Sequence, residues 1–230
     1  MVQRYDVVFP IYPMITQLDL TGPAQVLSRM PGAIMHLAAT TLDPVPTDAG
    51  FSILPTVTFN DCPQAAMLCV PGGAGTTAAM ADEQMLAFLR RQAEGAQLVT
   101  SVCTGSLLLA AAGLLRGYRA ACYWAWREYL RPFGAEPVAE RVVIDRNRIT
   151  GGGVTAGIDF AYRVIEHLHG RDEAEIVRLM LEYDPEPVGQ GGTPETARPE
   201  ILAITKDRML AGGNEKRLAA MQELVARAQG

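Results

Sequence analysis

The chain has 230 residues, of which 49% are hydrophobic and 20% are charged, and its formal net charge at pH 7 is −5. This composition is typical of a globular protein that is long enough to bury a substantial core. The negative charge, without any block of basic residues, argues against a nucleic-acid partner, and no apolar run is long enough to predict a membrane-spanning helix.

The cysteines and histidines give no indication of a metal site. The four cysteines form no CxxC pair and no metal-ligand cluster with the three histidines. The first residues lead directly into an apolar run and lack the layout of a signal peptide. We therefore expect reduced thiols, a cytoplasmic location and no bound metal.

The first third of the chain predicts three strands. Apolar and β-branched residues form short runs at 5–11, 34–40 and 66–70. Between the second and third runs, segment 43–61 has Pro, Gly and short alternating stretches, which predict a small hairpin or an excursion at a sheet edge. The glycine-rich segment 71–75 follows the third run. It is either a simple turn or a place where backbone amides approach a ligand closely.

An acidic residue, Asp19, precedes the first predicted helix. Thr21 and Pro23 suit the N-cap and first turn of a helix, so we expect Asp19 in the loop between the first strand and that helix. In a parallel sheet this loop opens at the carboxyl edge, where α/β proteins bind ligands. Asp19 therefore has two interpretations, a functional carboxylate and an ordinary loop or capping residue.

The rest of the chain alternates predicted helices and strands. Helical patterns cover 82–94, 124–130, 154–169, 171–183 and much of 201–228 with a break at 212–213, and strand patterns cover 98–103, 118–123 and, as two strands, 137–150. The alternation predicts an α/β fold with a mostly parallel sheet covered by helices on both faces. We expect one domain over 1–230, in which 184–199 is a Pro- and Gly-rich loop and 200–230 is a C-terminal helical extension.

Cys103 lies where a predicted buried strand turns into a helix. The residues before it are apolar and β-branched, and those after it are mainly Leu and Ala, which favour helix. This arrangement is typical of a nucleophile elbow. The free N–H groups and the positive end of the helix predict a thiol pKa below its usual value of about 8.5. The alternative interpretation of Cys103 is a small buried hydrophobic residue.

Five motifs, taken in their order, resemble the DJ-1/PfpI superfamily. They are Gln-Leu-Asp-Leu-Thr-Gly-Pro at 17–23, Val-Pro-Gly-Gly at 70–73, Thr-Ser-Val-Cys-Thr-Gly-Ser at 100–106, Ile-Thr-Gly-Gly-Gly-Val-Thr-Ala-Gly-Ile-Asp-Phe at 149–160, and Leu-Glu-Tyr at 181–183. The resemblance extends to about Tyr183, and it is strongest to the branch that hydrates isocyanides. It implies a flavodoxin-like architecture with a nucleophile elbow, no metal or organic cofactor, and a homodimer.

One position departs from the pattern of the wider superfamily. Many members carry a His shortly after the elbow helix, which pairs with the cysteine, whereas Tyr123 stands there in this chain. The departure argues against Cys–His chemistry. It favours a branch in which a carboxylate, here Asp19, transfers the protons.

The resemblance implies the addition of water to an isocyanide, R–NC, to give an N-substituted formamide. Cys103 would attack as a thiolate and form a covalent thioimidate. Asp19, with a pKa raised by burial beside the negative sulfur, would supply a proton and later activate water. We therefore expect a small-molecule isocyanide as the substrate.

The resemblance also implies supporting roles around this pair. The backbone N–H groups of Thr104 and Gly73 would hold a developing negative charge or a bound water, and Gly72, in the same turn, would also contribute to binding the substrate or this charge. Thr104 has an equally ordinary interpretation as a first-turn helix residue. Val154 would line the apolar part of the substrate, and Gly152 would allow the following helix to shift.

Two other functions stay open at this point. A related enzyme that acts on reactive carbonyl compounds such as methylglyoxal would also use Cys103, with different proton partners. A redox- or ligand-sensing binding protein would carry an oxidisable thiol here. Some relatives carry a fused helix-turn-helix region, and because this chain ends at Gly230 we expect none here.

Overall fold

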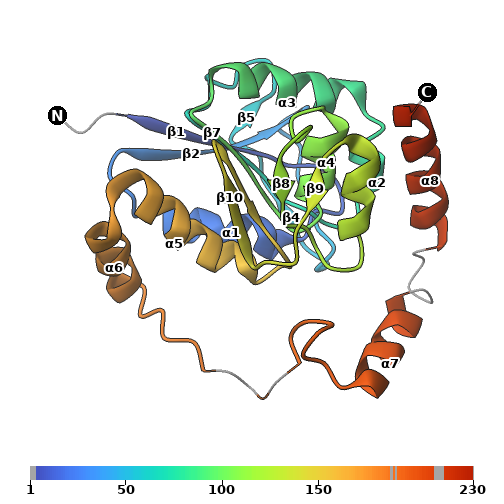
Figure 1. Cartoon of the computed structure of the whole chain (residues 1–230). Helices are drawn as coiled ribbons and strands as arrows, with labels where there is room; N and C mark the ends of the chain where they lie inside the picture. Colours follow the sequence, from blue (N-terminus) through green and yellow to red (C-terminus); the bar gives the residue numbers. More distant parts are fainter. Residues whose placement is uncertain (1–3, 187–188, 190, 210–214, 230) are drawn as a thin grey trace.

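The structure is a computed structural model, and it describes residues 4–186, 189, 191–209 and 215–229. Its centre is a seven-stranded sheet with the strand order β10-β11-β7-β6-β1-β2-β5 (Figure 1). All neighbours in this sheet are parallel except β10 and β11, which pair antiparallel as a hairpin. The strands are β1 (Tyr5–Pro10), β2 (Ala33–Ala39), β5 (Val57–Thr58), β6 (Met67–Val70), β7 (Leu98–Val102), β10 (Val142–Asp145) and β11 (Arg148–Gly151).

Helices cover both faces of this sheet, as the alternating pattern predicts. In Figure 1, α3 and α4 lie above the sheet and α1 and α5 lie below it. A buried cluster of apolar side chains lies on each face of the sheet. Strands β6 and β7 contribute side chains to both clusters, because every residue of these two strands is buried. The helices are α1 (Gln17–Leu27), α2 (Thr76–Ala79), α3 (Glu83–Gly95), α4 (Gly105–Ala111), α5 (Ala156–His169), α6 (Arg171–Met180), α7 (Pro199–Met209) and α8 (Glu215–Gln229), with a 3-10 helix η1 at Arg127–Phe133.

Two elements differ from the sequence-based expectation. Helix α1 begins at Gln17, so Asp19 lies in its first turn and not in the preceding loop, and Pro23 lies inside the helix. The predicted strand 118–123 shrinks to β8 (Arg119–Ala120), which pairs with β9 (Glu136–Pro137) in a separate small sheet. Residues 43–61 form a hairpin of β3 (Val45–Pro46) and β4 (Ser52–Ile53), followed by the edge strand β5. The predicted break at 212–213 lies outside the described residues.

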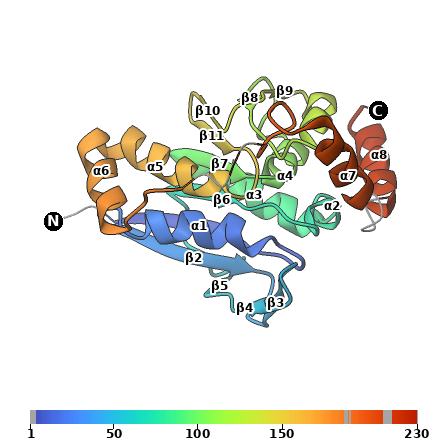
Figure 2. The same ribbon diagram turned by 90° about the horizontal axis from the view of Figure 1, so that it is seen from below.

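The C-terminal helices lie at the opposite end of the molecule from α6 (Figures 1 and 2). Helix α8 packs against η1 and α2, and its Met221 is only 1% exposed within the apolar cluster that also contains α3 and α4. A buried methionine at this point shows that α8 is part of the core on that face. The extension therefore packs on its own chain in this structure.

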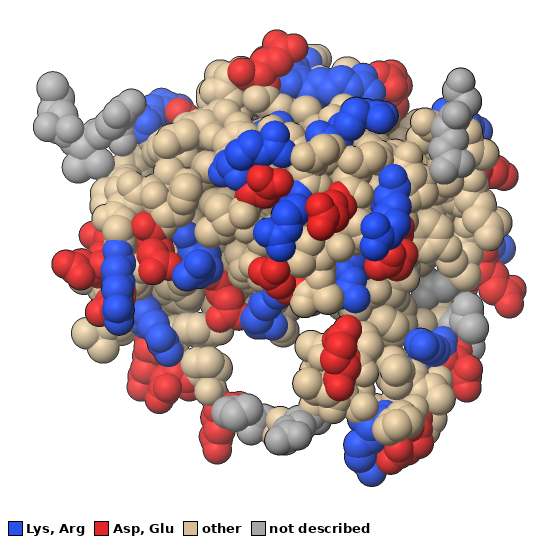
Figure 3. Space-filling view, viewed as in Figure 1, with Lys and Arg blue, Asp and Glu red and all other residues tan. Residues whose placement is uncertain are grey.

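The surface carries charges of both signs. On the face in Figure 3, Lys and Arg side chains are interspersed with Asp and Glu side chains and do not gather into one field. No helix among the described residues is long and apolar enough to cross a membrane.

Candidate active site

The turn between β7 and α4 holds Cys103 in an uncommon backbone conformation. Its φ is +60°, a left-handed value that L-residues with side chains rarely adopt. The Cys103 N–H donates to the Gly151 carbonyl of β11 (3.1 Å), which fixes the turn to the neighbouring strand. A Cβ on Gly105 would lie 2.0 Å from the Val70 carbonyl oxygen, so only glycine lets α4 start this close to β6. The predicted elbow geometry is present, and the side chain is 5% exposed.

The first turn of α1 brings Asp19 to the same place. The residue is fully buried (0% exposed), and the Gly72 N–H donates to its Oδ2 at 3.0 Å. Its other oxygen, Oδ1, is also buried, and no N–H or O–H of the described residues hydrogen-bonds to it. A carboxylate with an oxygen in this condition loses the hydration that stabilises its charge.

Gly72 packs between the Asp19 carboxyl group and Thr104 at the start of α4. A Cβ at this position would lie 2.5 Å from the Thr104 nitrogen and 2.9 Å from Asp19 Oδ2. Any side chain would therefore push the carboxyl group and the elbow apart. The absence of a Cβ at Gly72 lets Asp19 approach the start of α4.

Thr104 belongs to a buried hydrogen-bond network. The Gly73 N–H donates to Thr104 Oγ1 (3.0 Å), and the Thr104 and Thr76 hydroxyls are 2.8 Å apart. Thr76 in turn donates to the Gly73 carbonyl (2.9 Å). The Gly73 amide thus holds the Thr104 side chain. The Thr104 N–H makes its hydrogen bond to the Cys103 thiol.

Burial raises the pKa of the Asp19 carboxyl to about 7. The charge of Asp48 adds to the increase, whereas the hydrogen bonds from Gly72 and Cys103 oppose it. A carboxyl group with this pKa is present in both protonation states near neutral pH. It can therefore act as a proton donor and as a proton acceptor.

The expectation of a lowered pKa for Cys103 is wrong for the resting site. Burial raises the pKa of the thiol well above its usual range, and the nearby Asp19 and Cys122 add to the increase. The hydrogen bond from the Thr104 N–H lowers it, but this one contact at the helix start does not outweigh the loss of water and the acidic neighbour. The sequence pattern reveals the helix end but not the depth of burial.

Together these shifts describe a pair that shares protons. With Cys103 as a neutral thiol and Asp19 as its acidic neighbour, ionising both at once is costly because two like charges would be buried together. A proton can instead pass from sulfur to carboxylate when sulfur forms a bond to carbon. This arrangement suits a thiol that is activated only during attack.

A cavity of about 250 Å³ opens over Cys103. Of the residues predicted for the site, Thr104, Gly73 and Val154 also line it. Gly152 does not, and it lines a neighbouring pocket of about 360 Å³ that shares Val154 and Tyr123 with the first. Asp19 and Gly72 are buried and are not among the residues that line the cavity.

Of the other residues that line the cavity, the sequence drew attention to Tyr123 alone. Tyr123, predicted to replace a histidine, is a wall residue, and its hydroxyl contacts Met209 Sδ (3.8 Å) at the end of α7. Trp126, Arg217, Thr16 and Asp48 also line the cavity. No signal could have identified Met209 or Arg217, because they follow a long irregular segment whose path the sequence does not specify.

The described residues contain no group of three or more His, Cys, Asp or Glu side chains placed to hold a metal ion. No histidine lines the cavity among these residues. The groups nearest to the elbow are therefore the thiol, the Asp19 carboxyl group and the hydroxyl of Thr104, and Asp48, Tyr123 and Arg217 are further polar side chains of the cavity.

Comparison with known proteins gives consistent relatives. The family model described as the DJ-1/PfpI family matches residues 5–167. An isonitrile hydratase of Pseudomonas putida is 50% identical over 200 residues, which are 87% of this chain and 88% of that protein. A crystal structure of a ThiJ/PfpI family protein from Pseudomonas syringae superposes with a TM-score of 0.90 at 40% identity, covering 100% of this chain and 92% of that one. A glutathione-independent glyoxalase, DJR-1.2 of Caenorhabditis elegans, is 25% identical over 159 residues, 68% of this chain and 84% of that protein.

Proposed function

The chain belongs to the DJ-1/PfpI family, and on that premise we propose that it is an enzyme that adds water to an isocyanide to give an N-substituted formamide. The observation that carries the proposal is the partner of the cysteine. Cys103 is paired with a buried carboxyl group whose pKa is about 7, and no histidine lines the cavity among the described residues. The isonitrile hydratase at 50% identity supports the same chemistry.

The first step forms a carbon–sulfur bond at the terminal carbon of R–NC. The sulfur of Cys103 supplies the electron pair, and its proton passes to the Asp19 carboxylate during attack. Asp19 then delivers this proton to the same carbon, so the product is a thioimidate, R–N=CH–S–Cys103. The raised pKa of Asp19 suits both transfers, because a carboxyl group near pKa 7 gives up a proton about as readily as it accepts one.

The second step breaks the carbon–sulfur bond. Asp19, again a carboxylate, removes a proton from a water molecule as its oxygen attacks the thioimidate carbon. Asp19 passes this proton to the nitrogen, which gives the tetrahedral species R–NH–CH(OH)–S–Cys103. The carbon–sulfur bond then breaks and the hydroxyl proton goes to the sulfur, which leaves R–NH–CHO and the free thiol. Two steps of ordinary difficulty thus replace one direct addition of water.

The surrounding residues have positioning roles in this proposal. Gly72 holds Asp19 through its N–H and leaves room for it at the elbow. Gly73 holds the Thr104 hydroxyl, and because Thr104 lines the cavity we propose that it helps to position the attacking water. Val154 supplies an apolar wall for the R group. Gly152 lies at the start of the segment that leads into α5, and we propose that it allows this segment to adapt to the substrate.

We also propose a homodimer in the cytoplasm, without nucleic acid or membrane as a partner. Exposed apolar side chains of α6, namely Ile176, Leu179 and Met180, support an interface with a second protein surface. All four cysteines are free thiols, which supports a reducing compartment. The mixed charges on the face in Figure 3 are not those of a nucleic-acid footprint.

The test offers two substrates to the purified protein, an alkyl isocyanide and methylglyoxal, and follows their products by mass spectrometry. The proposal predicts formamide and no lactate. Lactate without formamide would overturn it in favour of a glyoxalase, the activity named for the relative at 25% identity. Neither product, with Cys103 oxidised by mild peroxide, would favour a redox sensor.

A further inference from the structure

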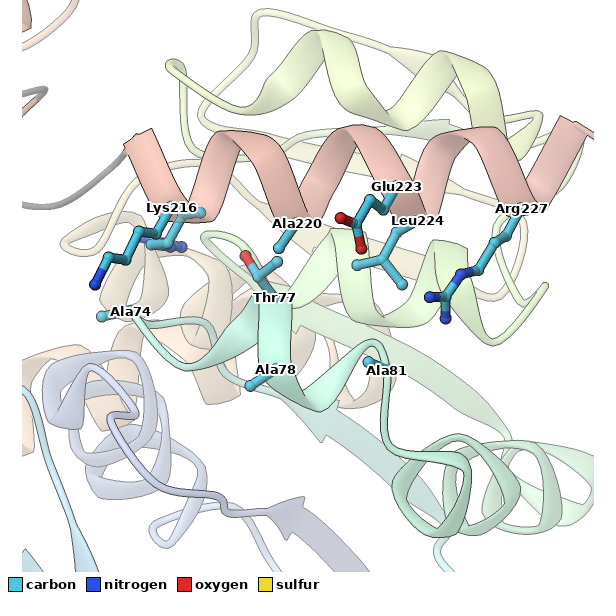
Figure 4. Close-up of a pocket in the computed structure, with 10 residues that line it drawn as sticks. Ala74, Thr77, Ala78, Ala81, Lys216, Ala220, Glu223, Leu224 and Arg227 are labelled. Atoms are coloured by element: carbon cyan, nitrogen blue, oxygen red, sulfur yellow. The ribbon is translucent and has the colours of Figure 1, made fainter.

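Helix α8 lies outside the part of the chain that the family model matches, which ends at residue 167. It is nevertheless firmly packed on that part. Met221 is buried in the cluster above the sheet, and Leu218, Leu224 and Val225 pack against the same cluster. Figure 4 shows one side of α8 turned towards α2, with Ala220 and Leu224 facing Thr77 and Ala81.

Arg217 projects from α8 to the wall of the Cys103 cavity. Its Nη2 donates to the Gly73 carbonyl at 3.2 Å, and its Cζ is 4.7 Å from the ring centroid of Trp126. Both contacts hold the guanidinium at the cavity lined by Cys103 and Thr104. A hydrogen bond and a cation–π contact from two different directions define one position for the charge.

The bond to Gly73 reaches the centre of the site. Gly73 holds Thr104 through its N–H, and the preceding residue, Gly72, holds Asp19. Arg217 therefore holds the same turn whose N–H groups orient the Asp19 carboxyl group and the Thr104 side chain. A helix at the end of the chain is coupled to the residues that would carry the chemistry.

Most of the other described ionisable groups around Cys103 are acids. Asp19 of α1 and Cys122 after β8 act electrostatically on the thiol. Asp48 after β3 and Tyr123 after β8 line the cavity, and the buried Tyr12 after β1 also interacts with Cys103 and Arg217. Each of them would repel a thiolate if it were ionised, whereas the guanidinium of Arg217 attracts one. Arg127 is a further cation, and it acts on Cys122.

We propose that Arg217 is a positioning residue of this site: its guanidinium favours the negative charge that develops on the Cys103 sulfur as the proton moves to Asp19, and it holds the Gly73 turn. The inference rests on the proposed role of Cys103 as a nucleophile, and not on the identity of the substrate. The step involves only a proton transfer from sulfur to carboxylate, so no oxidant or co-reactant is needed.

The test measures alkylation of Cys103 by iodoacetamide from pH 6 to pH 10, in the full-length protein, with peptide mass spectrometry to assign the modified cysteine. Arg217→Gln removes the charge, Arg217→Met also removes it but keeps the apolar stem against Trp126, and Arg217→Lys restores it. Arg227→Gln is the matched control, because it removes a charge from the same helix outside the Cys103 cavity. Thermal unfolding identifies any variant that does not fold.

We expect both charge-removing variants to react about tenfold more slowly at every pH in this range, because the raised pKa of the thiol lies above most of the range and one further unit reduces the thiolate fraction about tenfold. Arg217→Lys should recover most of the rate, and Arg227→Gln should match the wild type. Unchanged profiles in folded Arg217→Gln and Arg217→Met would overturn the inference, and so would a lysine variant that is as slow as the glutamine variant. If the wild type makes no formamide but the alkylation rate of Cys103 still depends on Arg217, the proposed substrate is wrong and this inference stands.

Discussion

The carboxyl group of Asp19 makes stability depend on pH in the direction opposite to that of an ordinary paired aspartate. Because its pKa is raised to about 7, the native state keeps a proton between about pH 4 and pH 7 that the unfolded chain has already released. The free energy of unfolding therefore contains a contribution that is present at low pH and is lost as the pH rises through 7. In Asp19→Asn this contribution is absent. The pH-dependent contributions of the other ionisable groups are common to both proteins, so they cancel when the two free energies of unfolding are compared.

We expect wild type to lose about 2–3 kcal/mol relative to Asp19→Asn between pH 5 and pH 8, measured by urea unfolding at both values. The same substitution should lower turnover at least a hundredfold, because no group is left to move the proton. Asp43→Asn, which alters an exposed carboxyl group, is the control. Parallel pH profiles for wild type and Asp19→Asn would mean that Asp19 is ionised normally in the folded protein.

Gly72 is the second residue at which a small change should have a large effect. In Gly72→Ala the new methyl group would lie 2.5 Å from the Thr104 nitrogen, so the turn or the elbow must move. We expect a loss of about 1–3 kcal/mol in stability and a larger relative loss of turnover, measured by urea unfolding and product formation.

Gly192→Ala serves as the control for this substitution, because no atom lies within 4 Å of the Cβ that it would add. It should behave as wild type in both measurements. Full activity in Gly72→Ala would show that the close approach of Asp19 to the elbow is not needed.

At the scale of elements, the sequence predicts most strands and the long helices but misplaces the start of α1. Its first turn, Gln17 to Leu20, has no side-chain cap, and the structure starts the helix there because packing buries Leu20 and Asp19. Pro23 is a good first-turn residue, which is why the local pattern favours a later start. Tertiary burial, which no local signal reports, overrides this preference.

Helix α8 gives the prediction that belongs to this scale. Met221→Ala removes a side chain that is 1% exposed in the core, and we expect it to cost about 2–5 kcal/mol of stability. It should also lower turnover, because Arg217 depends on the docking of α8. Urea unfolding and formamide formation measure the two effects.

Met180→Ala makes the same chemical change on α6, where the side chain is 63% exposed. It should alter stability by no more than about 0.5 kcal/mol at a low protein concentration. If Met221→Ala were equally mild, α8 would not be docked in solution as it is in this structure.

At the scale of the molecule, the features that the sequence predicts are those that depend on residues close together in the chain. The elbow at Cys103 could be found because its strand and helix are adjacent in sequence, and the alternation of elements predicted the parallel sheet. The raised pKa of Cys103 could not, because it depends on burial and on Asp19, which is far away in sequence. The contribution of α8 to the cavity could not be predicted from the sequence either. The single domain over 1–230 and the homodimer stay predictions.

The central claim is that Cys103 carries the hydration of an isocyanide. The most direct measurement mixes wild type and Cys103→Ala, side by side, with an alkyl isocyanide and follows formamide by mass spectrometry. We predict formamide from wild type and none above the uncatalysed background from Cys103→Ala, whose smaller side chain keeps the fold. Formamide from both proteins at similar rates, or from neither while Cys103 is free and reduced, would contradict the account.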